Sequence, residues 1–493
     1  MMEITAPRIA SFAHTDSSVL DMKGKMQKMK MKIKLSNKLY ITDAPVWLRK
    51  WCYGNLVLPN PDFYKKERLG KWTGNTPREI CLYEKIGDTL VLPFGVWDRH
   101  FYEMVRPETG KIESDIKPLK AIEYKSGTTL YPYQEKAVKE ALTKRNGIIV
   151  MPCGAGKTQT AIELIARLGG RALWLTHTGD LLNQSYNRAK DCLDVEDDTY
   201  GKITDGKVNI GTGITVATVQ TMAKMDLTPY KYEWDVIVVD ECHKAIGSPT
   251  KVMQFYKVVS SLACRYKFGL TATPERSDGL HKSMLALLGN IIITIPKEAV
   301  AETTCPVKVR YLGTGYAPSE DAFDTDGTMD YINLVDDLTH DEARFKRVFE
   351  TIKGLKSCLV LANRVEYLER LTKAYNEAGG NAICLSTLGT SKKAKETRKE
   401  SLKQLNAGSL DCIFATYKLA CEGLDVPSLK YVVLATPEKD ERIVTQAVGR
   451  VGRKAEGKAY GTVIDVKDNT LQGWASLRKR YYKKLEYEIE GDR

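Results

Sequence analysis

The sequence has no pair of cysteines in C-x-x-C spacing, although it contains 11 cysteines. That absence argues against zinc ribbons and redox pairs, so we interpret the thiols as reduced, mostly small buried hydrophobic residues. No apolar run approaches the roughly 18 residues that a membrane-spanning helix needs. The first apolar stretch is short and is broken by His14, Asp16 and Ser17, which differs from a secretory signal. We therefore expect a cytoplasmic protein with no membrane partner.

Acidic residues are in deficit, and the formal net charge is +12. An excess of positive charge favours a polyanionic partner such as nucleic acid, although charge by itself is a weak indicator. At 493 residues the chain is too long for a single hydrophobic core, so we expect two to four domains.

The N-terminal part separates into two segments. Residues 1–25 have low apolar density and no periodicity, which predicts a disordered tail. Residues 26–120 predict a small α+β or mostly β accessory domain for nucleic-acid binding or substrate specificity. From Lys28 the alternation of lysine with Met31, Ile33 and Leu35 predicts a strand with an apolar and a basic face. The basic face fits solvent or a DNA backbone equally, and the many aromatic residues fit a small core better than base stacking.

From about Leu130 onward, buried strands alternate with amphipathic helices, a pattern typical of doubly wound parallel sheets. Two such series predict two α/β domains in tandem, at 121–298 and 341–475. The polar, Asp-rich stretch 299–340 between them predicts a linker or surface insertion. Residues 476–493 are interpreted as a basic C-terminal tail, with a short helix that packs on the second domain and turns its charged face to solvent.

Two phosphate-handling segments stand about eighty residues apart in the first α/β series. The glycine-rich segment 151–158 follows an apolar run and precedes a helix-like stretch, so its N–H groups and the helix dipole would face phosphate oxygens. Lys157 would contact the outer phosphates and Thr158 would ligate Mg²⁺. The second segment is a β-branched run that ends in Asp240 and Glu241, carboxylates at the ligand-binding edge of the sheet. Together they predict a nucleoside triphosphate site, although Met151 stands where the strict loop pattern has its first glycine.

The second α/β series lacks a phosphate loop but has two arginines three residues apart, Arg450 and Arg453. Residues at this spacing share one helix face, which Gln446 extends. A guanidinium group matches phosphate oxygens and stays charged at any working pH. The poor helix formers Gly449 and Gly452 beside the arginines suggest close approach of a backbone or ligand.

The ordered motifs resemble those of superfamily 2 helicases of the DExH type over residues from about 130 to 470. The phosphate loop and the later Thr-Ala-Thr look most like XPB/Ssl2-type helicases and their UvsW-like phage and bacterial relatives. The Q motif corresponds to Leu130–Gln134, motif I to Gly154–Thr158, motif Ia to Thr176–Gln184 and the next DNA-backbone motif to Ala217–Thr221. Motif II corresponds to Asp240–His243 and motif III to Thr271–Pro274. In the second series, motif IV corresponds to Leu361–Arg364, motif V to Thr416–Asp425 and motif VI to Gln446–Arg453.

The resemblance implies an α/β fold of two tandem RecA-like doubly wound parallel-sheet domains with a small N-terminal α+β accessory domain. It implies ATP and Mg²⁺ as cofactors, with the metal held by Thr158 and Asp240. The implied catalytic residues are Lys157, Thr158, Asp240, Glu241, Gln446, Arg450 and Arg453. The implied cofactor-binding residues are Gln134, Pro152, Cys153, Gly154, Ala155, Gly156, Lys157, Thr158, Gly423 and Asp425. His243, Thr271 and Thr273 would couple hydrolysis to movement, and Thr176, His177, Thr218, Arg364 and Thr416 would grip nucleic acid.

The expected activity is that of an ATP-dependent DNA helicase or translocase in replication, recombination or repair, in a bacterial or phage-infected cytoplasm. The expected partner is duplex, branched or single-stranded DNA, bound by a monomer. Where the group carries Arg-Glu-Asp, this chain has Arg276-Ser277-Asp278, which argues against a strand-separating wedge. Three alternatives stay open: an ATP-gated clamp that does not translocate, an RNA helicase, and the motor of a nuclease. The last is disfavoured because only about forty residues follow Arg453.

Overall fold

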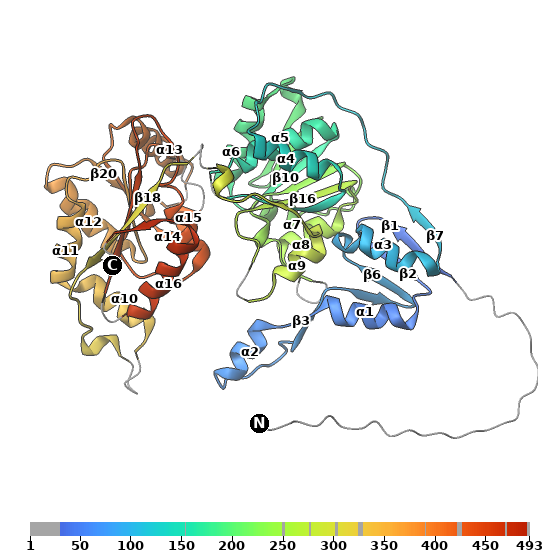
Figure 1. The fold of residues 1–493 in the computed structure, drawn as a ribbon, viewed down its shortest axis with the longest axis horizontal. Helices are drawn as coiled ribbons and strands as arrows, with labels where there is room; N and C mark the ends of the chain where they lie inside the picture. The colour runs from blue at the N-terminus through green and yellow to red at the C-terminus, as the bar shows by residue number, and fades with distance from the viewer. Residues whose placement is uncertain are drawn as a thin grey trace, which may run out of the picture.

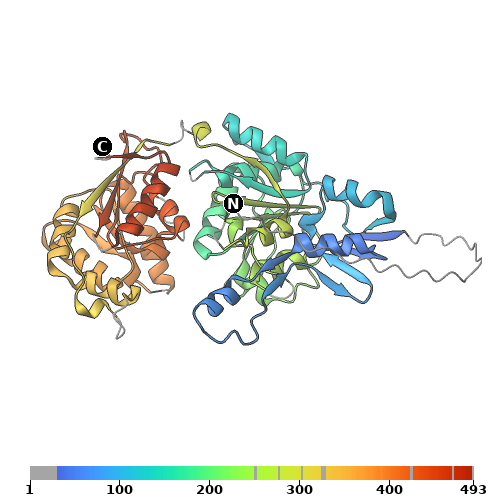
Figure 2. The ribbon, with the colours of Figure 1, turned by 60° about the horizontal axis from the view of Figure 1, so that its bottom comes forward.

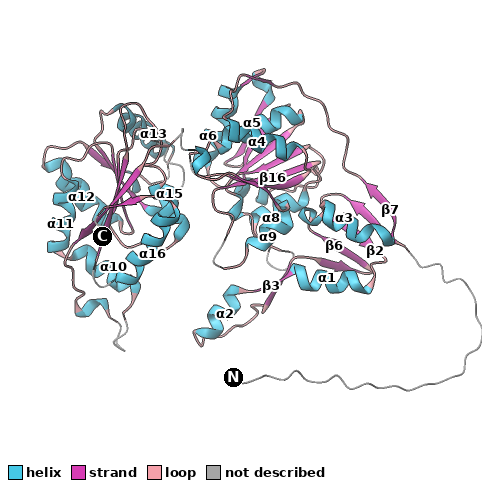
Figure 3. Ribbon diagram, in the orientation of Figure 1, coloured by secondary structure: helices cyan, strands magenta, loops and turns pink. Residues whose placement is uncertain are grey.

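A computed structural model describes residues 30–152, 154–248, 252–275, 278–300, 304–323, 329–389, 391–421, 426–468 and 471–490. The chain builds an accessory domain and two α/β lobes, which are coloured from blue through green to red in Figure 1 and by secondary structure in Figure 3. The tail expected over 1–25 lies outside the described residues. Among the described helices, none is long and apolar enough to cross a membrane.

The accessory domain is built on a five-stranded sheet with strand order β5-β6-β2-β1-β7, in which only β1 and β7 pair in parallel. Burial alternates along β1, which confirms the predicted strand with one apolar face. Its strands and helices are β1 (Met31–Leu35), β2 (Leu39–Thr42), α1 (Val46–Leu56), β3 (Val57–Pro59), α2 (Pro61–Arg68), β4 (Glu79–Cys81), β5 (Glu84–Ile86), β6 (Thr89–Leu92), α3 (Arg99–Val105) and β7 (Thr109–Ser114).

This domain is fastened to the first lobe by polar and apolar contacts. Asn37 donates its side-chain amide to Ser260 O at 2.6 Å, and the buried Lys267 of lobe 1 donates to Asn37 O at 3.4 Å. Ile246, Leu280 and Ala286 of lobe 1 belong to the apolar cluster of the accessory domain. The Cβ of any other residue at Gly95 would lie 2.4 Å from Gly289 N, so only glycine permits this approach of the two backbones.

Lobe 1 contains an eight-stranded sheet of order β13-β12-β14-β10-β15-β16-β9-β17, parallel except for β13. Apolar clusters cover both faces, which is why its strands are continuous hydrophobic runs. The strands are β9 (Asn146–Val150), β10 (Ala172–Thr176), β12 (Tyr200–Thr204), β13 (Lys207–Asn209), β14 (Ile214–Thr218), β15 (Val236–Val239), β16 (Tyr266–Thr271) and β17 (Ile291–Thr294). The α-helices are α4 (Pro132–Leu142), α5 (Lys157–Leu168), α6 (Gly179–Cys192), α7 (Val219–Lys224), α8 (Gln254–Ser261) and α9 (His281–Leu288). A separate strand pair joins β8 (Lys125–Ser126) to β11 (Leu193–Asp194).

Lobe 2 contains a seven-stranded parallel sheet of order β20-β21-β19-β22-β23-β18-β24. Its strands are β18 (Val307–Gly313), β19 (Cys358–Ala362), β20 (Ala382–Cys384), β21 (Cys412–Thr416), β22 (Tyr431–Leu434), β23 (Gly461–Lys467) and β24 (Glu488–Ile489). Its α-helices are α10 (Tyr331–His340), α11 (Glu342–Ile352), α12 (Val365–Glu377), α13 (Lys392–Ala407), α14 (Tyr417–Cys421), α15 (Glu441–Val448) and α16 (Gln472–Lys484). With the first lobe, this arrangement gives the two tandem doubly wound domains that the sequence predicts.

Two expected boundaries of lobe 2 need correction. The stretch 299–340, expected to be a linker or insertion, supplies β18, which pairs with β23 over seven residues, and also α10. The expected tail 476–493 instead contributes most of α16 and the edge strand β24. The α16 residue Arg478 is 2% exposed, and its guanidinium donates to Asp465 at 2.7–3.1 Å. That side of the basic helix therefore faces the core, where a buried ion pair compensates the charge.

Candidate nucleotide and nucleic-acid site

The loop between β9 and α5 has the geometry of a phosphate cradle. Gly154 and Gly156 adopt φ of +83° and +74°, left-handed values that favour glycine. The loop ends at the N-terminus of α5, where backbone N–H groups and the helix dipole attract anions. Met151, which replaces the first glycine of the strict pattern, is fully buried and donates its N–H to Thr271 O at 2.9 Å. That position extends the sheet, so it does not need the freedom of glycine.

Gln134, on α4, contacts the phosphate loop itself. Its side-chain NH₂ donates to Ala155 O at 3.1 Å, and its Oε1 accepts the Tyr131 N–H at 2.9 Å. The residue is 1% exposed, and a Cβ at Gly156 would lie 2.3 Å from its Nε2. The Tyr133 hydroxyl also donates to Ala155 O, at 3.3 Å. In this conformation the Gln134 amide therefore stabilises the phosphate loop by its hydrogen bond to Ala155 O. The resemblance separately implies an adenine-reading role for this residue.

Asp240 and Glu241 follow β15 at the carboxyl edge of the sheet, where β16 lies between β15 and β9. Asp240 is 6% exposed, and its Oδ1 accepts the N–H of Glu241 at 2.9 Å. Glu241 has φ of +48°, a strained value for a residue with a side chain. Burial and the adjacent Glu241 carboxylate raise the pKa of Asp240. A buried carboxylate beside a partly buried one favours a cation, so this pair suits a metal that also takes phosphate and water oxygens, as Mg²⁺ does.

The predicted coupling residues form a connected cluster behind these carboxylates. His243 Nδ1 lies 3.1 Å from Thr271 Oγ1 and 3.2 Å from Glu241 Oε2. The Thr271 hydroxyl donates to Thr273 O at 3.2 Å and accepts the Thr273 N–H at 3.1 Å. The structure thus brings His243, Thr271 and Thr273 together at the ends of β15 and β16.

Gln446 lies on α15 of lobe 2.

The nucleic-acid residues predicted in lobe 1 gather at the ends of β10 and β14, where Thr176 and Thr218 are paired across the sheet. The Thr176 hydroxyl is buried and donates to Thr178 O at 3.1 Å, so its side chain faces the protein here. The Thr218 and Thr221 hydroxyls are 2.9 Å apart. His177 contacts Lys244 Nζ through Nε2, and burial with that ammonium group lowers the pKa of His177 to about 4.

The corresponding residues of lobe 2 lie at the ends of β19 and β21. Arg364 pairs with Asp336 and donates to Ile332 O at 3.3 Å, so part of its charge is neutralised within the lobe. Thr416 donates its N–H to Ser386 Oγ at 2.9 Å. The predicted cofactor residues Cys153, Gly423 and Asp425 lie outside the described residues. Contact of Arg364 and Thr416 with nucleic acid stays a prediction.

Arg450 and Arg453 lie in the turn that follows α15, which ends at Val448, so the helix face predicted for them is not formed. This segment is held by the chain that enters lobe 2. Cys305 donates its N–H to Gly452 O at 2.9 Å, and Thr304 forms an isolated antiparallel bridge with Arg453. The Thr304 methyl carbon is also 3.8 Å from an ideal Cβ built on Gly154. One connecting residue therefore lies beside both the phosphate loop and the arginine segment. Sequence reasoning missed Thr304 and Cys305, because their contacts are largely made by backbone atoms that leave no motif.

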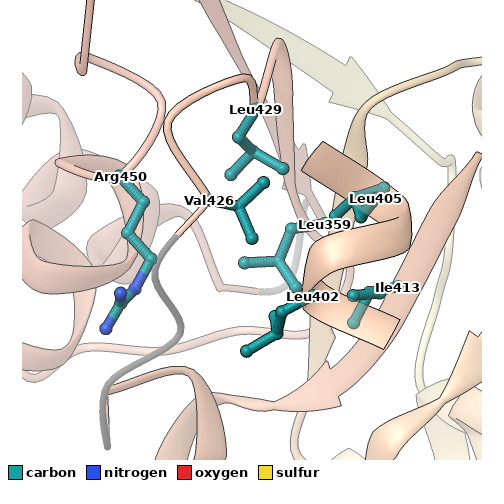
Figure 4. A pocket seen from close by; sticks show the side chains of 7 residues that line it. All are labelled: Leu359, Leu402, Leu405, Ile413, Val426, Leu429 and Arg450. Carbon is teal, nitrogen blue, oxygen red and sulfur yellow. The ribbon is translucent and has the colours of Figure 1, made fainter. Parts of the chain in front are cut away.

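Figure 4 shows Arg450 at the edge of an apolar pocket inside lobe 2. In this view its side chain lies to one side of the six apolar side chains, and the guanidinium lies apart from them. The other lining residues come from α13, β19, β21 and the loop before β22: Leu359, Leu402, Leu405, Ile413, Val426 and Leu429. Arg450 thus lines a pocket of lobe 2, and its approach to a nucleotide stays a prediction.

Comparison with known families and proteins identifies both lobes. Residues 127–276 match the family described as type III restriction enzyme, res subunit, and residues 343–455 match the helicase conserved C-terminal domain. The chain is 27% identical over 363 residues to "DNA 3'-5' translocase XPB2" of Sulfurisphaera tokodaii, covering 67% of this chain and 80% of that protein. It is 26% identical over 426 residues to "Putative ATP-dependent RNA helicase L396" of Acanthamoeba polyphaga mimivirus, covering 83% and 77%.

Among solved structures, the chain is similar to the ATP-dependent Type ISP restriction-modification enzyme LlaBIII bound to DNA. The TM-score is 0.52 at 17% identity, and the match covers 76% of this chain and 30% of that one. At that identity the similarity supports the fold alone.

Proposed function

Because this chain belongs to superfamily 2 of the helicases, in the XPB-like group, and hydrolyses ATP on nucleic acid, we propose that it couples hydrolysis to movement along DNA. The observation that carries this proposal is the position of Thr304 beside both the phosphate loop of lobe 1 and the arginine segment of lobe 2. A nucleotide held by the first element would then be reached by the second, so that hydrolysis follows the approach of the lobes.

The proposed division of labour follows from the chemistry of each group. The loop amides and Lys157 hold the phosphates, while Glu241 orients the attacking water and accepts its proton. Thr158 and Asp240 would hold Mg²⁺, which supplies positive charge to the phosphate oxygens. Arg450 and Arg453 would stabilise charge on the transferred phosphoryl group. An arginine donated in this way raises turnover by roughly 10³–10⁵-fold.

Transmission to the nucleic-acid side runs through the cluster behind Glu241. His243 touches both Glu241 and Thr271, so a change at the carboxylate alters hydrogen bonds at the ends of β15 and β16. We propose that Thr176, His177 and Thr218 on lobe 1, with Arg364 and Thr416 on lobe 2, grip one strand through its backbone. Backbone contacts bind without sequence preference and weaken with salt. Alternating grip by the two lobes would advance the protein along the strand.

DNA is proposed over RNA because of the similarity to the XPB translocase, whereas the mimivirus relative keeps RNA as the outcome to exclude. The test compares ATP hydrolysis stimulated by DNA and by RNA of equal length and sequence. Stronger stimulation by DNA is expected, and stronger stimulation by RNA would assign the protein to RNA.

We further propose that a monomer acts in replication, recombination or repair in the cytoplasm of a bacterial or phage-infected cell.

The site itself is tested by Lys157→Ala and Glu241→Gln. Lys157→Ala removes the charge that holds the outer phosphates, so both ATP binding and hydrolysis should fall. Glu241→Gln keeps the shape of the side chain but removes the base, so ATP should still bind while DNA-stimulated hydrolysis is lost. Retention of stimulated hydrolysis in either variant would refute the assignment.

A further inference from the structure

The accessory domain carries an arm, residues 57–81, which consists of β3, α2, a loop and β4. Its base is anchored, because Leu58 and Ile80 are paired across β3 and β4 and both are buried. Beyond the base, α2 buries no residue at all. In Figures 1 and 2, α2 projects from the accessory domain toward the side on which lobe 2 lies.

Internal hydrogen bonds hold the arm in one shape although it projects. Asn60 caps α2 and donates its side-chain amide to Pro77 O at 2.7 Å. Lys66 Nζ donates to Thr76 Oγ1 at 2.7 Å, and Arg78 donates to the Tyr64 hydroxyl at 3.2 Å. These bonds join α2 and its cap to the segment that leads into β4, so the two sides of the arm are held together.

Trp72 lies on the loop and is 86% exposed, the largest exposed fraction among the described large hydrophobic residues. Its ring lies over Gly74, where an added Cβ would be 2.7 Å from the ring atom Cζ3. Gly74 has φ of +49°, so glycine provides both the turn and the space for the indole. One side of the indole therefore rests on backbone and the other is left to solvent.

Exposed basic residues lie near Trp72 in the sequence. Lys65 and Arg68 stand on the last turns of α2, and Lys71 precedes Trp72 in the loop. Exposed aromatic faces beside lysine and arginine are the pattern by which proteins bind single strands, because bases stack on the ring while phosphates meet the cations. In a duplex the bases are stacked on each other, so an indole face finds a partner only where a base is unpaired.

We propose that the arm binds single-stranded DNA, with Trp72 stacked on an unpaired base and Lys65, Arg68 and Lys71 placed against the adjacent phosphates. This inference rests on the proposed function, since it names the element that would meet the unpaired part of a DNA substrate. It also gives the accessory domain a task distinct from the strand grip of the two lobes.

The test measures binding of a fluorescent oligo(dT) and of a blunt duplex to the full chain and its variants. Stacking on one aromatic ring makes a difference of between about fivefold and 150-fold in affinity. Trp72→Ala should therefore weaken oligo(dT) binding within that range and leave duplex binding unchanged. Trp72→Phe, which keeps a ring, should restore most of the affinity. Ile86→Ala is the matched control, because Ile86 is 60% exposed in the same domain but lies on β5, outside the arm.

Salt dependence separates the two contributions. Lys71→Ala should reduce the slope of log affinity for oligo(dT) against log salt by about 0.7, the value for one phosphate contact on a single strand. Trp72→Ala should lower affinity at every salt concentration without changing the slope. Equal affinities for Trp72→Ala and wild type, or equal weakening on oligo(dT) and duplex, would overturn the inference. If DNA does not stimulate ATP hydrolysis by the wild-type protein, the proposed function is refuted instead.

Discussion

Substitution of Gly156 by alanine should damage the phosphate loop more than the same change at Gly154. Both residues have left-handed φ, so each alanine pays a backbone strain of about 1–2 kcal/mol. At Gly154 the new Cβ would meet only the Thr304 methyl carbon, at 3.8 Å. At Gly156 it would lie 2.3 Å from Gln134 Nε2, so the buried amide must move and give up its bond to Ala155 O.

The lost hydrogen bond of Gln134 determines how much less stable Gly156→Ala is than Gly154→Ala. A buried polar group left without its hydrogen bond costs about 1–3 kcal/mol. For a domain of this size, such a loss lowers the melting temperature by roughly 2–4 °C per kcal/mol. The nucleotide-free Gly156→Ala protein should therefore melt roughly 2–12 °C below Gly154→Ala in a thermal-shift assay.

A double mutant separates the clash from strain. Gln134→Ala removes the atom that the new Cβ would strike, so adding it to Gly156→Ala should cost less than adding it to wild type. Gln134→Ala in the Gly154→Ala background is the control, because no clash exists there to relieve. Equal melting temperatures for the two glycine variants, or strictly additive effects with Gln134→Ala, would refute the reasoning.

Two further predictions concern the second lobe and the buried ammonium group beneath the accessory domain. Arg453→Ala should leave ATP affinity near the wild-type value and reduce turnover greatly, as measured by nucleotide titration and steady-state kinetics, and an equal loss of both would contradict an inter-lobe arginine. Burial lowers the pKa of Lys267 from 10.5 to about 8, so the unfolded chain binds more protons than the folded chain between these values. Stability therefore rises with pH across this window, and wild type should gain about 3 kcal/mol relative to Lys267→Met between pH 8 and 10.5. A pH-independent difference between their thermal unfolding curves would exclude this origin.

The geometry of the proposed ATP site was predictable from the sequence because each part is local. The glycine-rich loop and the Asp240–Glu241 pair directly follow buried strands, and parallel strands deliver such residues to one edge of a sheet. Non-local contacts were not accessible. The motif assigned Gln134 to adenine but gave no sign of its bond to Ala155, which lies 21 residues away in the chain.

The boundary errors have a similar origin. The strand β18 contains Lys308 and Arg310 between its apolar residues, so its surroundings looked like a polar linker, yet Val307 and Val309 are buried beside β23. Arg478 looked solvated because its neighbours are basic, and only the fold reveals Asp465 as its partner. In both cases a charged residue has a partner outside its local motif: Glu490 lies 180 residues from Arg310, and Asp465 lies 13 residues from Arg478.

Displacement of a triplex-forming third strand from duplex DNA tests the central claim most directly, because it reports movement along DNA apart from hydrolysis. We expect the wild-type protein to release the third strand only when ATP is hydrolysed, and Glu241→Gln to bind ATP and DNA without releasing it. DNA-stimulated hydrolysis by the wild type with no release of the third strand would contradict coupling to translocation and would indicate an ATP-gated clamp.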